Sequence, residues 1–139
     1  MRDLYHNVLA TQVLSPVTAT TAKTSSTIDL QGFNSVSVVF AVGQSGDALS
    51  GSLYWTLKLQ HSDDDSSYSD AAATDINAGA ATIVVNSPSL DEAAYSFGYI
   101  GGKRYLQAVA TPTGSISSGV PIGIVALCGT AAYRPVVTP

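Results

Sequence analysis

The stretch LYWTLKLQ, residues 53–60, decides the fold class because its side chains alternate with a period of two. Side chains of a β-strand point in turn to its two faces, so one face would carry Leu53, Trp55, Leu57 and Leu59. The other face would carry tyrosine, threonine, lysine and glutamine. A strand with one apolar and one polar face is typical of an antiparallel sheet that is wet on one side.

Residues 35–42 repeat this pattern and predict a second half-buried strand. Shorter runs rich in β-branched or aromatic residues predict further strands at residues 80–86, 95–99, 103–111 and 120–129, an edge strand and loop over 16–28, and a return strand over 68–76. The pair Gly101-Gly102 is expected to close a hairpin between residues 95–99 and 103–111, since glycine accepts the positive φ angles of a tight hairpin turn.

About eight short strands with frequent turn signals and no sustained helix predict an all-β fold, an antiparallel β-sandwich or barrel that is jelly-roll-like or immunoglobulin-like. We expect a single β domain over residues 15–139, preceded by an extended N-terminal arm over residues 1–14. The side chains expected to build the core are Val36, Val38, Phe40, Leu53, Trp55, Leu57, Leu59, Leu106 and Val125.

The N-terminal arm is the candidate interface. It carries the apolar residues Leu4, Tyr5, Val8, Leu9 and Val13 ahead of the first clear strand. A terminal segment this apolar is normally tied down against something. Two interpretations stay open, a bridge to a partner protein and packing on its own sandwich.

Charge is scarce in this chain of 139 residues, because only 12% of them are charged where about 25% is usual. Six Lys and Arg against ten Asp and Glu give a net charge of −4, and Lys103-Arg104 is the largest basic cluster. Too few cations are present to neutralise many phosphates, so nucleic acid is not expected as a partner.

No membrane segment or signal peptide is expected. The charge-free stretch of residues 105–133 is interrupted by polar and turn residues, for example at 111–115, and predicts strands and a loop. Asp3 lies where a signal peptide would be basic and apolar, so the chain is expected to be made in the cytoplasm.

No catalytic constellation is visible, so we expect a protein that is not an enzyme. Residues 114–119, GSISSG, do not match the G-x-S-x-G pattern of a serine nucleophile. His6 and His61 are far apart in sequence, and His61 is expected to pack at the end of its strand. Cys128 lies in an apolar strand and is expected to be a small buried side chain.

Neither a metal nor another cofactor is expected. Asp63, Asp64 and Asp65 form an acidic run that could attract calcium, but the run lacks the ligand spacing of a calcium loop and is better explained as a turn. Two histidines and one cysteine cannot supply four zinc ligands. No glycine-rich nucleotide-binding pattern is present.

The seven tyrosines leave sugar binding open, because aromatic rings stack on sugar faces. That interpretation requires Tyr54, Tyr68 and Tyr105 to converge on one exposed concave surface.

Five stretches in order, MRDL at 1–4, DLQGF at 29–33, LKLQHSDD at 57–64, GYIGGKRY at 98–105 and YRPV at 133–136, carry a family resemblance. The chain resembles small structural proteins encoded beside the major capsid gene of tailed bacteriophages, which are taken to be head decoration or cement proteins. The resemblance implies a β-rich, non-enzymatic and usually trimeric protein. It implies the major capsid protein as partner, and a location on the outer capsid surface after synthesis in the host cytoplasm.

Three functions are therefore carried forward. A capsid cement protein, which is favoured, predicts threefold assembly and binding to a preformed capsid. A head-tail or tail structural protein predicts rings or sixfold stacks. A carbohydrate-binding β-sandwich on the virion surface predicts glycan-dependent binding by the isolated domain.

Overall fold

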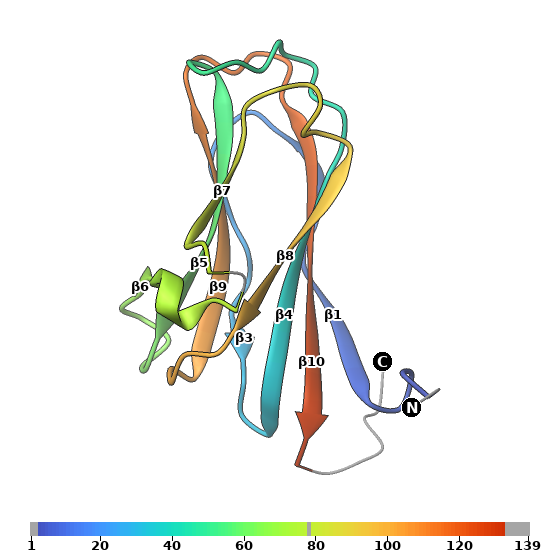
Figure 1. Cartoon of the computed structure of the whole chain (residues 1–139), viewed down its shortest axis with the longest axis vertical. Coiled ribbons are helices and arrows are strands. Elements are labelled where there is room, and N and C mark those ends of the chain that lie inside the picture. Colours follow the sequence, from blue (N-terminus) through green and yellow to red (C-terminus); the bar gives the residue numbers. More distant parts are fainter. Residues whose placement is uncertain (1–2, 78, 133–139) are drawn as a thin grey trace.

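Two antiparallel β-sheets packed face to face form the computed structural model, which describes residues 3–77 and 79–132 (Figure 1). Sheet A has the strand order β1 (Val8–Ala19), β10 (Val120–Ala131), β4 (Phe33–Val42) and β8 (Ala93–Tyr99). Sheet B has β9 (Tyr105–Thr113) and β5 (Tyr54–Ser62) at its centre. The short strands β2 (Lys23–Thr24) and β3 (Ile28–Asp29) pair with β9, and β6 (Ser69–Asp70) and β7 (Thr82–Val85) pair with β5. The sheets remain open, so the sandwich is confirmed and the barrel is not.

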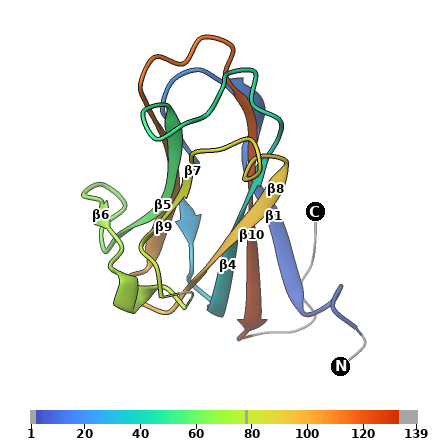
Figure 2. The ribbon, with the colours of Figure 1, turned by 45° about the horizontal axis from the view of Figure 1, so that its top comes forward.

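The chain alternates between the two sheets, and Figure 2 shows the loops that cross between them at both ends. If β2 with β3 and β6 with β7 are each counted as one interrupted strand, eight strands remain, and only β5 and β6/β7 are sequence neighbours within one sheet. Strands from the start and the end of the chain lie side by side, as in the pair β1 and β10. This is the strand order of a jelly roll, one of the two expected sandwich types.

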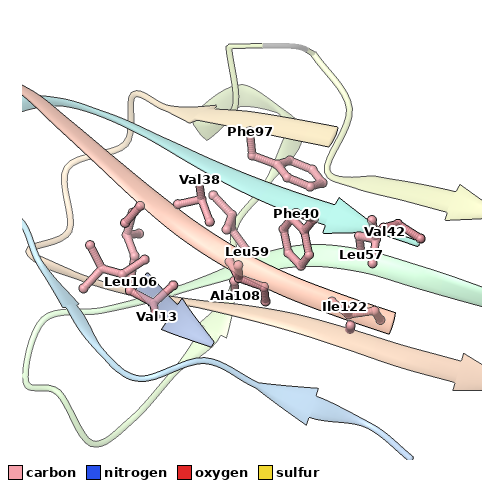
Figure 3. Packing of buried hydrophobic residues seen from close by; sticks show 14 of the residues in the cluster. Val13, Val38, Phe40, Val42, Leu57, Leu59, Phe97, Leu106, Ala108 and Ile122 are labelled. Carbon is pink, nitrogen blue, oxygen red and sulfur yellow. The ribbon is translucent and has the colours of Figure 1, made fainter. Parts of the chain in front are cut away.

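The core lies between the sheets, where the inward side chains of both interdigitate (Figure 3). Phe40 of β4 and Phe97 of β8 make an edge-to-face contact with centroids 5.6 Å apart. Seven of the nine expected core residues are buried: Val36, Val38, Phe40, Trp55, Leu57, Leu59 and Leu106. The other two, Leu53 and Val125, are only half-buried. Val125 was assigned wrongly because both faces of β10 are apolar, and the buried hydrophobic residues of β10 are Val120, Ile122, Ile124, Ala126 and Cys128.

The expected hairpin at Gly101-Gly102 is wrong, since β8 pairs with β4 in sheet A while β9 pairs with β5 in sheet B. The two glycines lie in a link that crosses between the sheets. A Cβ on Gly101 would lie 2.5 Å from the Tyr99 hydroxyl, so glycine is needed there for the chain to pass over the Tyr99 ring. The pair therefore reflects close packing and not a hairpin turn.

The expected return strand over residues 68–76 is mostly absent. Only β6 pairs with β5, and a 3-10 helix η1 (Ala73–Asp75) follows it. The run of alanines there has low β propensity. The Asp75 carboxylate accepts the Ala72 backbone N–H at 3.3 Å, and this bond closes the turn.

The segment expected to be an arm, residues 1–14, is described from Asp3, and its second half belongs to the sandwich. Strand β1 starts at Val8 and pairs with β10 from Val8 opposite Gly129 to Ala19 opposite Val120. Val13 is 7% exposed within the core. Of the two interpretations left open, packing on its own sandwich describes residues 8–14, and only residues 3–7 precede the sheet.

Candidate interaction surface

The four strands of sheet A contain no Asp, Glu, Lys or Arg. When the outer side of an antiparallel sheet faces water, some charged side chains are expected on that side. The outer side of sheet A instead carries small, apolar or uncharged polar side chains. We name this surface the neutral face and define it by the outward residues of β1, β10, β4 and β8.

The register of sheet A aligns these side chains in rows across the strands. The central row joins Gln12, Val125, Val39 and Ser96. The neighbouring rows join Ala10, Leu127, Ser37 and Gly98 on one side, and Gly123, Ala41 and Ala94 on the other. Val39 and Val125 are half-buried by their neighbours, whereas Ala41, Ala94 and Ser96 are exposed. The neutral face therefore has two half-buried valines at its centre, with small or uncharged polar side chains around them.

Two shallow hollows mark the ends of the neutral face. One, of about 640 Å³, lies near the start of β1 and is lined by Leu4, Val8 and Leu127, among others. The other, of about 400 Å³, lies near the end of β4 and includes Ala41 and Pro121. Neither hollow contains a group of titratable side chains that would suggest chemistry.

The outer side of sheet B is different, because it carries a polar network. Lys58 Nζ and Gln60 Nε2 both donate to the Asp70 carboxylate at 2.8 Å, and Gln107 Nε2 donates to Gln60 Oε1 at 2.7 Å. The hydrogen bond from Lys58 lowers the pKa of Asp70. Such a surface is suited to water, so the two outer sides of the sandwich have different chemistry.

The structure divides the five candidate interface residues into two groups. Leu4 and Tyr5 are 62% and 67% exposed, and Val8 lines the first hollow beside Leu4. Leu9 and Val13 pack against or within the core. Leu4, Tyr5 and Val8 therefore lie where a partner could reach them, whereas Leu9 and Val13 do not.

A short turn holds the exposed N-terminal residues in place. Asp3 accepts the His6 backbone N–H at 3.2 Å and lies 2.7 Å from His6 Nδ1, and these bonds lower the pKa of Asp3. The Val8 N–H donates to the Leu4 carbonyl at 3.1 Å. The turn thus presents Leu4 and Tyr5 in a defined position at the end of β1.

The basic pair Lys103-Arg104 is engaged by carboxylates. Arg104 Nε and Nη2 donate to both oxygens of Asp29 at 2.9 Å, which lowers the pKa of Asp29 to about 2. Lys103 pairs with Asp63. These cations border a cleft of about 570 Å³ that also includes Phe33 and Tyr99. Because both charges are already paired, the cleft is poorly suited to anions.

The acidic run forms a turn, as expected. Asp64 accepts the Ser67 and Ser66 N–H groups at 2.9 and 3.0 Å and the Ser62 hydroxyl at 2.8 Å, and these bonds lower its pKa, with the Ser67 N–H contributing most. Asp65 accepts the Thr27 and Tyr68 hydroxyls at 2.7 and 2.5 Å. Over residues 3–77 and 79–132, no three His, Cys, Asp or Glu side chains are placed to hold a metal ion.

The three tyrosines of the sugar hypothesis do not converge. Tyr54 starts β5, whereas Tyr105 pairs with Ser62 at its other end, about 27 Å away along the strand. Tyr68 lies outside β5, and its hydroxyl donates to Asp65. The Arg104 guanidinium lies 4.8 Å from the centre of the Tyr105 ring and occupies one of its faces.

The remaining candidates are packed within the fold. Cys128 is 5% exposed, as expected, and burial raises the pKa of its thiol. His61 Nδ1 lies 2.9 Å from the Tyr99 hydroxyl at the end of β5, the strand-terminal place expected for this histidine. Among the described residues, no helix has the length and apolar character needed to cross a membrane.

Two solved structures are similar to this chain over most of its length. One is the SPBc2 prophage-derived protein YomS, at 12% identity and a TM-score of 0.49, covering 88% of this chain and 92% of its own. The other is a protein of Bacillus endospore appendages, which form disulfide-linked pili, at 11% identity and a TM-score of 0.48, covering 91% and 90%. No protein family matches the sequence, and neither does any curated protein.

The neutral face was not singled out from the sequence. Its residues are the serines, alanines and valines that alternate with core positions, and these residue types also occur on ordinary solvated faces. The available signal was that the segments forming four long strands lack charge. Only the register shows that these strands adjoin in one sheet.

Proposed function

We propose that this chain is a non-enzymatic structural protein of a tailed-phage virion, which binds the major capsid protein on the outer capsid surface and assembles as a homotrimer. The resemblance of five stretches to capsid decoration proteins supports the virion assignment. The observation that carries a structural role is the neutral face, a whole sheet surface without charge on an otherwise acidic protein.

The amino-acid composition of the neutral face suits a permanent assembly. Ordering a long charged side chain at an interface costs conformational entropy, whereas Ala, Ser and Gly lose little. An interface made of such residues gains its free energy from buried area and close packing. A cement protein that must resist pressure on a shell needs this kind of contact.

The N-terminal turn is the proposed capsid contact. Leu4 and Tyr5 are large, exposed and apolar, and the turn fixes them beyond the end of β1. Removing residues 1–14 would delete half of β1 and the buried Val13, so that deletion would unfold the sandwich. A Leu4→Ser/Tyr5→Ser variant tests the contact without touching the core.

The experiment is decoration of capsids that lack this protein, with occupancy read from an electron-microscopy map. The expected result is threefold density over capsid subunits for the native chain and a large loss of occupancy for the double variant. Val84→Ser is the matched control, because Val84 is 41% exposed on the outer side of the other sheet, where it pairs with Thr56. Full occupancy by the double variant would overturn the N-terminal contact, and rings in the tail would replace the capsid assignment with the tail alternative.

A further inference from the structure

The outer sides of the two sheets differ in a way that points to partners of different chemistry. Sheet B presents the Lys58, Asp70 and Gln60 network to water. The neutral face of sheet A presents Val39 and Val125 at its centre, with Ala41, Ala94 and Ser96 around them. A contiguous surface of apolar and small uncharged side chains on one side of a protein points to an interaction site.

The neutral face has the size that one partner contributes to a stable interface. Four strands about 4.8 Å apart and about ten residues long give the sheet a planar area of about 600 Å². The side chains that project from the sheet add to this area. A standard protein interface buries about 800 Å² on each partner. The whole face, together with the hollows at its two ends, therefore matches a complete interface.

The edges of sheet A are protected, which favours contact through the face. The edge strand β1 contains Pro16 and two register shifts, features that hinder pairing with another strand. At the other edge, the Asn77 N–H donates to the Gly98 carbonyl at 2.7 Å, and Ile76 bridges to Tyr99. Addition of a foreign strand is thereby blocked at part of β8.

We infer that the neutral face packs against a second copy of this chain. A surface without charge needs a partner without charge, because an unpaired charge buried against it would lose its hydration with no compensation. The neutral face of another copy meets this condition, because its four strands carry no charged side chain and Glu92 lies only at the rim, in the hollow near the end of β4. A two-fold axis would stack two sheets as in an ordinary sandwich, and a three-fold axis would gather three such faces around the axis.

The test is the mass of the purified full chain in solution, measured by sedimentation velocity over a range of micromolar concentrations. We expect a trimer of the 14.3 kDa chain, as in the proposed function, whereas a dimer would support this interface and remove the proposed trimer. Val125→Lys places a charge in the central row and is expected to give monomer. Ser96→Lys, at an exposed position of the same row, should weaken association at least tenfold and spares any half-buried side chain.

Val84→Lys is the matched control. Val84 is 41% exposed on the outer side of sheet B, where it pairs with Thr56. The Val84→Lys substitution introduces the same charge on the polar outer side of sheet B and should leave the mass of the oligomer unchanged. A native chain that stays monomeric, or an oligomer that survives both Val125→Lys and Ser96→Lys, would overturn the inference. The measurement needs no capsid, so failure of capsid binding alone would remove the proposed function and leave this interface standing.

Discussion

Tyr99 and His61 join the two sheets at one end of the sandwich. The Tyr99 hydroxyl of β8 lies 2.9 Å from Nδ1 of His61 of β5, and their rings meet edge to face at 84°. The same hydroxyl accepts the Lys103 backbone N–H at 3.1 Å. One oxygen therefore links both sheets and the crossing loop between β8 and β9, and burial raises the pKa of this hydroxyl and keeps it protonated.

Removing this hydroxyl should weaken the fold. Tyr99→Phe keeps the ring and leaves the Lys103 N–H and His61 Nδ1 without their partner, at an expected cost of about 1–3 kcal/mol in the free energy of unfolding. Urea unfolding followed by circular dichroism measures it. Tyr54→Phe is the control, since the Tyr54 hydroxyl bonds no described residue. Equal stability of the two variants would show that the link contributes nothing.

Trp55 is the largest fully buried side chain, with 1% exposure, and its Nε1–H finds no acceptor in the described part of the chain. Trp55→Ala should cost about 3–5 kcal/mol through lost burial and the cavity left behind. Trp55→Phe should cost less, because it keeps part of the packing and removes an unsatisfied donor. Differential scanning calorimetry compares the two. An unchanged melting curve for Trp55→Ala would contradict the inward register of β5.

The sequence predicted the strands well because their period of two is a local property. β4, β5 and β8 all carry alternating patterns, and all three form where expected. Strand partners are not local in a jelly roll, because consecutive strands enter opposite sheets. The Gly101-Gly102 pair therefore indicated a hairpin, although the link crosses the sandwich.

The prediction of interface residues failed in part for the same reason, because the sequence does not show which distant strands pair. Residues 4–13 are apolar for two different reasons, and only pairing with β10 separates Leu4, which is exposed, from Val13, which is buried. Likewise β10 is apolar on both sides. One side fills the core, and the other, including Val125, belongs to the neutral face.

Asp47 ties together the loops at the other end of the sandwich and makes stability sensitive to acid. It accepts the Ser117 hydroxyl and the Gly119 N–H at 2.7 Å and the Ser118 N–H at 3.0 Å, and these bonds lower its pKa to about 2. The unfolded chain, with the ordinary value of 3.8, takes up the proton first as the pH falls. The contribution of Asp47 is therefore complete above about pH 4 and is lost as the pH drops toward 2.

Asp47→Asn should accordingly be less stable than the native chain at neutral pH and lose less stability between pH 4 and pH 2. Urea midpoints measured across this range provide the comparison. Glu92→Gln controls for the removal of one negative charge, since the Glu92 side chain accepts no hydrogen bond from the described residues. Parallel acid profiles for the native chain and Asp47→Asn would show that the Asp47 carboxylate does not contribute to the acid sensitivity.

Alanine variants of Gly114 and Gly32 distinguish the cost of backbone strain from the cost of a steric clash. The two glycines have nearly the same φ, +86° and +87°, in different surroundings. Alanine at either position should cost about 1–2 kcal/mol through the left-handed backbone alone. A Cβ on Gly32 would meet nothing within 4 Å, whereas one on Gly114 would lie 2.5 Å from the Ser52 carbonyl oxygen. Gly114→Ala must therefore shift the backbone and should lose about 1–3 kcal/mol more than Gly32→Ala. Chemical unfolding of both variants measures the difference, and equal losses would mean that the loop between β9 and β10 relaxes freely around the added methyl group.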